Sequence, residues 1–105
     1  MGANVLDVAK TYGMQVESLP VAFASFLYDH QRNTIVLTTF FDTINREAED
    51  ALAQIEARMV DSFQESFSLD FHTIHLMGRN VDEFVPIGAV PLVRKPRKSV
   101  KKPRK

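Results

Sequence analysis

Cysteine and tryptophan are both absent from this chain of 105 residues. Without cysteine there is no disulfide, no thiolate zinc site and no cysteine nucleophile, so the fold does not depend on the redox state of its compartment. Glycine is scarce, and its four copies stand apart at positions 2, 13, 78 and 88. They build neither the glycine-rich loop that cradles phosphates nor the dinucleotide fingerprint. The common nucleotide-binding motifs are therefore excluded, although other nucleotide sites are not.

Long apolar runs are also missing, since no stretch approaches the roughly 18 residues of a membrane span. The first ten residues have no basic cluster and carry Asp7 inside their apolar stretch, unlike a secretory signal. A hydrophobic content of 45% and a charged content of 25% are typical of one small soluble domain. We therefore expect a cytoplasmic protein, or a nuclear one in a eukaryote.

The charges are distributed very unevenly along the chain. Residues 1–93, the body, hold all 13 acidic residues and only five basic ones, a net charge of −8. Residues 94–105, the basic arm, hold no acid and a net charge of +8, from Arg94, Lys95, Arg97, Lys98, Lys101, Lys102, Arg104 and Lys105. Two prolines and dense like charge disfavour a packed structure there. The sequence thus predicts a small domain over 1–93 and a disordered basic tail over 94–105.

The basic arm has several interpretations. Eight cations suit nonspecific contact with phosphates of a nucleic acid or with an acidic protein surface. No aromatic residue is interleaved, so stacking on single-stranded bases is not predicted from the arm itself. The same clusters resemble a nuclear localisation signal. They also suit a clasp, in which the arm binds the acidic body through opposite charges, or a tail that only raises solubility. We expect polyanion binding.

Apolar periodicity and turn-forming residues predict helices at 3–12 and 43–63, strands at 21–28, 34–41 and 69–77, a helical turn at 81–85 and an edge strand at 89–93. Gly13 is expected to end the first helix, and Asp42 or Thr43 to cap the second. The order α-β-β-α-β predicts a small α/β (α+β) domain whose mixed sheet packs on one long helix.

The long helix carries the clearest pattern, an apolar stripe made of Ile44, Ala48, Leu52, Ile55, Met59 and Phe63. The first strand is apolar on both faces, so the sheet needs a cover on each side. The N-terminal helix or a second copy of the chain would supply the second cover. We favour a homodimer.

Candidate sites in the body are few. Asp70, His72 and His75 crowd together, but strand geometry turns His75 to the opposite face, so no metal site is predicted. If strands 34–41 and 69–77 run parallel, their carboxyl ends bring Asp42, Thr43, Arg79 and Asn80 to one edge, where α/β sheets bind ligands. No convergent catalytic set and no cofactor motif is present, so we expect a binding domain rather than an enzyme.

The closing part of the body, 69–76 followed by 84–92 (FVPIGAVPL), is similar to the last strand, helical turn and glycine-led final strand of minimal nucleotidyltransferase domains. That family needs a Gly-Ser after its first strand and two alternating aspartates on the second to hold magnesium. This chain has Tyr28-Asp29 at the first place and no acid in 34–41. The resemblance therefore implies a degenerate, non-catalytic relative that binds a small anionic ligand near Asp42 and Arg79.

Overall fold

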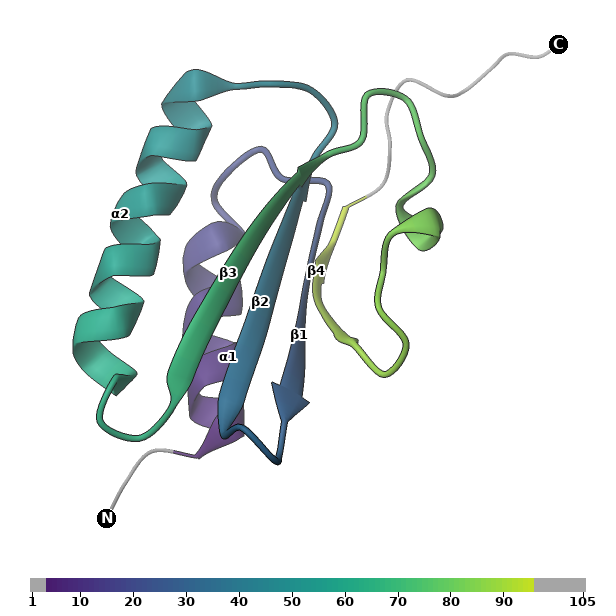
Figure 1. The fold of residues 1–105 in the computed structure, drawn as a ribbon. Coiled ribbons are helices and arrows are strands. Elements are labelled where there is room, and N and C mark those ends of the chain that lie inside the picture. Colours follow the sequence, from purple (N-terminus) through teal and green to yellow (C-terminus); the bar gives the residue numbers. More distant parts are fainter. Residues whose placement is uncertain (1–3, 96–105) are drawn as a thin grey trace, which may run out of the picture.

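The computed structural model describes residues 4–95. Its elements are α1 (Val5–Val16), β1 (Phe23–Asp29), β2 (Thr34–Phe41), α2 (Arg46–Phe63), β3 (Ser68–His75), the 3-10 turn η1 (Val81–Glu83) and β4 (Val90–Arg94) (Figure 1). The predicted α-β-β-α-β order and the closing edge strand are confirmed. The predicted disorder of 96–105 lies outside the described residues.

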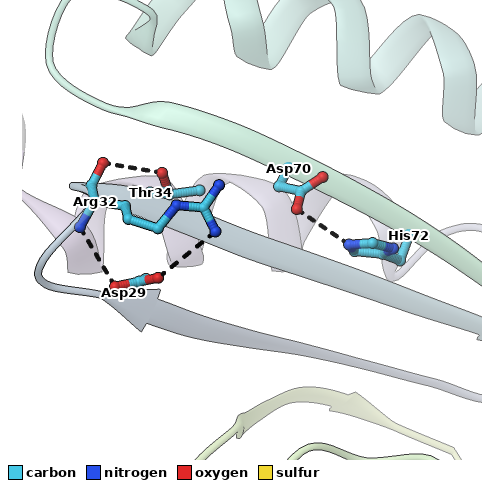
Figure 2. Close-up of polar contacts among 5 residues, drawn as sticks. All are labelled: Asp29, Arg32, Thr34, Asp70 and His72. Carbon is cyan, nitrogen blue, oxygen red and sulfur yellow. Dashed lines mark hydrogen bonds and ion pairs between the residues drawn. The ribbon is translucent and has the colours of Figure 1, made fainter.

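The four strands form one mixed sheet in the order β3-β2-β1-β4. β1 is antiparallel to both β2 and β4, whereas β2 and β3 are parallel because α2 crosses over between them. In the β1–β2 hairpin loop, Asp29 accepts a 3.4 Å hydrogen bond from the Arg32 N–H, and Thr34 Oγ1 donates to the Arg32 carbonyl (Figure 2). The parallel pair places the carboxyl ends of β2 and β3 together at one edge of the sheet.

Both helices cover the same face of the sheet. Their buried side chains form one core with Ala24 and Phe26 of β1 and with Ile35, Leu37 and Phe41 of β2. At the centre of this core the Tyr12 hydroxyl shares a 2.6 Å hydrogen bond with Thr39 Oγ1, and burial raises the pKa of Tyr12 far above its usual value. Within residues 4–95, neither helix has the length and apolar character needed to cross a membrane.

The apolar stripe of α2 is confirmed over most of its length, since the helix buries Ala48, Leu52, Ile55 and Met59. The predicted start is wrong. Ile44 lies before the helix and is 64% exposed, and the N-cap is Asn45 rather than Asp42 or Thr43. The Asn45 side chain accepts a 3.0 Å hydrogen bond from the Ala48 N–H, as good N-cap residues do.

α1 begins as expected and ends later than expected. Asn4 and Asp7 form a reciprocal capping box at its start. The prediction that Gly13 ends the helix is wrong, because α1 continues to Val16, which is fully buried one turn after Tyr12. A glycine inside a helix costs about 1 kcal/mol, and the burial of the Val16 side chain offsets that cost.

The second face of the sheet is covered by a loop rather than by a helix. Phe23, Phe40 and Leu76 are buried there, and Val81 and Phe84 from the segment after β3 pack on them. The alternative that the N-terminal helix covers this face is wrong, since α1 lies beside α2 (Figure 1). The same segment continues across this face, since Phe84 and Pro86 line a small pocket with Val36 and His72, and Gly88 lies close to Leu27 of β1.

Candidate functional site

The structure describes the first two cations of the basic arm, and both are held by the folded domain. Arg94 ends β4, and its guanidinium lies 4.7 Å from the centroid of the Phe23 ring. The Lys95 ammonium donates to the carbonyls of Glu17 at 2.8 Å and Leu19 at 2.5 Å. A cation at the end of a helix is favourable because the carbonyl ends of the peptide dipoles gather there. Lys95 therefore fixes the origin of the arm beside the end of α1.

The other predicted polyanion-binding residues lie outside the described residues; they are Arg97, Lys98, Lys101, Lys102, Arg104 and Lys105. Of the predicted set, the structure thus places only the two cations that already have contacts within the domain. Arg94 belongs to β4, and Lys95 donates to the Glu17 carbonyl at the end of α1. A variant that tests the arm should therefore leave both residues in place.

The structure brings the residues of the predicted ligand edge to one end of the sheet. β2 and β3 are parallel, and beyond them Met77 donates its N–H to the Asp42 carbonyl at 2.8 Å. Asp42, Thr43, Arg79 and Asn80 are all exposed around this edge. Asn80 caps η1 by accepting a 3.0 Å hydrogen bond from the Asp82 N–H. The Arg79 guanidinium lies 5.8 Å from the centroid of the Phe84 ring.

The start of α2 is a poorer anion site than its position suggests. The Asn45 side chain occupies the Ala48 N–H, and Glu49 Oε2 accepts the Asn45 N–H at 3.0 Å. Glu47 adds a second carboxylate in the first turn. These groups already complement the positive end of the helix dipole. A further anion would meet two carboxylates there, so any anionic ligand should lie away from the helix.

A cavity of about 440 Å³ lies on the side of the edge away from α2. It is lined by Ala22, Phe23, Leu76, Asn80, Val81, Asp82, Arg94 and Lys95. Among the predicted edge residues only Asn80 reaches it, and the two described cations of the arm line its rim. Apolar side chains and the Arg94 guanidinium line the cavity together with Asp82, so a small molecule with an apolar part and a negative charge fits best on the Arg94 side.

The histidines of β3 lie on opposite faces of the sheet, as predicted. His72 Nε2 lies 3.2 Å from Asp70 Oδ2 on the face away from the helices (Figure 2), whereas His75 Nε2 lies 2.9 Å from Glu49 Oε2 of α2. Among residues 4–95 no three His, Cys, Asp or Glu side chains gather around a point that could hold a metal ion.

Glu49 makes the stability of the folded protein depend on pH. Its pKa lies below the usual 4.5 because the carboxylate accepts hydrogen bonds from the Asn45 N–H and from His75. A carboxyl group with a lowered pKa contributes stability above pH 4.5, and this contribution is lost as the pH falls through the pKa of the folded state. Glu49→Gln should therefore lower the melting temperature at neutral pH, and the difference from wild type should shrink below pH 4.5.

Thermal melts followed by circular dichroism between pH 3 and 7 measure this difference. Glu47→Gln is the matched control, because it removes the same charge from the same helical turn without touching His75. A difference that stays constant with pH, or that is the same for both variants, would contradict the role given to Glu49.

Phe23 and Asp82 line the cavity but were not predicted from the sequence as site residues. Phe23 belongs to β1 and Asp82 to η1, and only the pairing of β4 with β1 brings the arm to them. No local pattern in the chain signals that pairing. In sequence comparisons, no protein-family model and no curated protein matches the chain.

Proposed function

We propose that this protein is a non-catalytic binding domain that presents the basic arm to nucleic acid in the cytoplasm. The observation that carries the proposal is the separation of charge, with −8 on the body and +8 on the arm. An acidic body repels phosphates, so contact with a nucleic acid falls to the arm. Binding through phosphates alone is insensitive to base sequence.

The fixed origin of the arm supports this proposal. Lys95 is tied to the end of α1, and Arg94 is paired with Phe23 of β1, so the arm leaves the domain from a defined position. Six further cations follow Lys95 in the sequence. The domain thus serves as a stable acidic carrier, and the arm serves as its binding element.

The direct test replaces the six later cations with glutamine in the full chain, at Arg97, Lys98, Lys101, Lys102, Arg104 and Lys105. We expect loss of binding to a mixed-sequence duplex with an unchanged melting temperature. Retained affinity would contradict the proposal, and marked destabilisation would favour a clasp on the acidic body instead. Binding to an acidic protein but not to duplex or single strand would contradict the choice of nucleic acid.

The nucleotidyltransferase resemblance implies a second candidate function, a site for a small anionic ligand near Asp42 and Arg79, and the cavity beside this edge shifts that site toward Asn80 and Arg94. Arg94 at the cavity rim supplies a cation, and Phe23, Leu76 and Val81 supply an apolar floor. A thermal-shift screen with nucleotides and organic acids tests this candidate. We expect a stabilising ligand whose effect is lost in Arg94→Ala, which removes the guanidinium of the cavity, and kept in Arg32→Ala, which alters an exposed arginine of the distant hairpin. No stabilisation by any compound would remove this candidate.

A further inference from the structure

The two edges of the sheet differ in how they are protected against pairing with another strand. β4, at one edge, contains Pro91, and its pairing with β1 shifts register between Ala24 and Ser25, which makes a bulge. β3, at the other edge, has eight residues (SLDFHTIH) with no proline, glycine, lysine or arginine. Its register with β2 is continuous from end to end. Natural edges are usually blunted by such devices, and within residues 4–95 only the β4 edge has them.

The direction of the hydrogen bonds shows which backbone groups β3 exposes. Ser68 donates its N–H to Asn33 at 3.1 Å, and Leu76 donates to Phe41 at 2.8 Å, both toward the β2 side. In a parallel ladder the groups of alternate residues point to the same neighbour. The N–H and C=O groups of the odd-numbered residues therefore point away from β2, to the outer edge; these residues are Leu69, Phe71, Thr73 and His75.

The charges on β3 favour one register for a second copy of the same strand. Asp70 and His72 lie side by side on the face away from the helices (Figure 2). An antiparallel pair centred on Phe71 places each Asp70 opposite His72 of the second copy. Centring on Asp70 would oppose two aspartates, and centring on His72 would oppose two histidines. A histidine ring N–H can donate to a facing carboxylate, whereas two facing carboxylates repel each other, so the Phe71 register is self-complementary.

The same register uses the outward-pointing backbone groups correctly. With Phe71 opposite Phe71 of the second copy, the facing residues Leu69 and Thr73 also both point outward. These pairs exchange two hydrogen bonds each, and the Asp70–His72 pairs fall at the positions between them, where side chains approach most closely. Charge and backbone hydrogen bonding therefore select the same arrangement.

The flank of α2 above this edge combines three apolar residues with two glutamates. Glu49 bonds to His75 of β3, whereas Arg58 bonds to Gln15 of α1, so these residues mark opposite flanks of the helix. The β3 flank continues from Glu49 in steps of four, three, four and three through Ala53, Glu56, Val60 and Phe63. Burial raises the pKa of Glu56, which makes its neutral form easier to reach. This flank is compatible with the approach of a second helix.

From the unprotected edge and its self-complementary charges, we propose that the chain forms a two-fold homodimer in which β3 pairs antiparallel with β3 of a second copy, centred on Phe71. The two four-stranded sheets then become one continuous sheet. The dimer carries two basic arms, which raises the avidity for a long polyanion beyond that of one arm. Formation of the proposed dimer does not require the proposed nucleic-acid binding.

The test uses two full-length variants with opposite charge on the strand. Asp70→Lys with His72→Lys makes both positions basic, and His72→Asp makes both acidic. Each variant opposes like charges at both facing pairs of its own homodimer, whereas a mixed dimer has two opposite-charge pairs. We expect dimeric wild type in sedimentation at micromolar concentration. For each variant alone, the dimer dissociation constant should rise about tenfold or more, and the equimolar mixture should form heterodimers.

A third variant, Thr73→Pro, removes an outward N–H and leaves the bonds to β2 intact. It should fold, as judged by circular dichroism, and remain monomeric. A monomeric wild type would overturn the proposal. Wild-type dimerisation that survives in all three variants, or folded charge variants that form no heterodimer when mixed, would equally overturn pairing through β3. Because none of these measurements involves nucleic acid, their outcome is separate from that of the proposed function.

Discussion

Replacing Leu52 or Ile55 by alanine is expected to cost about 2–5 kcal/mol of unfolding free energy, because each removal leaves a cavity in the core. Leu52 is 2% exposed and Ile55 is 5% exposed, and both lie on the buried stripe of α2. A small domain has about 5–15 kcal/mol of net stability, so either variant loses a large share of it. Because the chain has no tryptophan, urea unfolding followed by far-ultraviolet circular dichroism is the suitable measurement.

Ile44→Ala is the matched control for these two variants. It removes a similar volume from a residue of the predicted stripe, but Ile44 lies outside α2 and is 64% exposed. A surface substitution of this kind should change the free energy of unfolding by less than about 0.5 kcal/mol. A loss at Ile44 comparable to that at Leu52, or no loss at Leu52 and Ile55, would contradict the packing of α2 on the sheet.

The elements with a strong local pattern could be predicted from the sequence. The β2 strand was expected at 34–41 and spans Thr34–Phe41, and the repeat of Ala48, Leu52, Ile55 and Met59 identified α2. The edge strand predicted at 89–93 is found as β4, where Pro91 is tolerated although it has no N–H to donate, because an edge strand has a neighbour on one side only. Such features depend on the periodicity and backbone chemistry of a few adjacent residues.

Features that depend on long-range packing could not be predicted in this way. Gly13 reads locally as a helix end, but the burial of Val16 against the sheet continues the helix. The cover of the second face comes from Val81 and Phe84, which have no periodic pattern. The contacts of Arg94 with Phe23 and of Lys95 with Glu17 require β4 to pair with β1, and no local signal specifies that neighbour.

Binding of the full chain to a mixed-sequence duplex is expected to weaken steeply with salt. If the six cations after Lys95 each contact a phosphate, the slope of log affinity against log salt is about −5, a loss of about 10³-fold between 50 and 200 mM. The slope arises because each contacted phosphate releases a condensed counterion. A binding mode through the acidic body would not show it, since the body lacks a comparable density of cations.

The most direct measurement of the central claim is this salt slope in two triple variants with the same change in net charge. One replaces Lys101, Lys102 and Lys105 by glutamine in the arm, and the other replaces Lys10, Arg32 and Arg46, which are exposed in the body. If the arm is the binding element, the arm variant should reduce the slope to about −3, and the body variant should leave it near −5. An unchanged slope in the arm variant, or an equal reduction in both, would contradict binding through the arm.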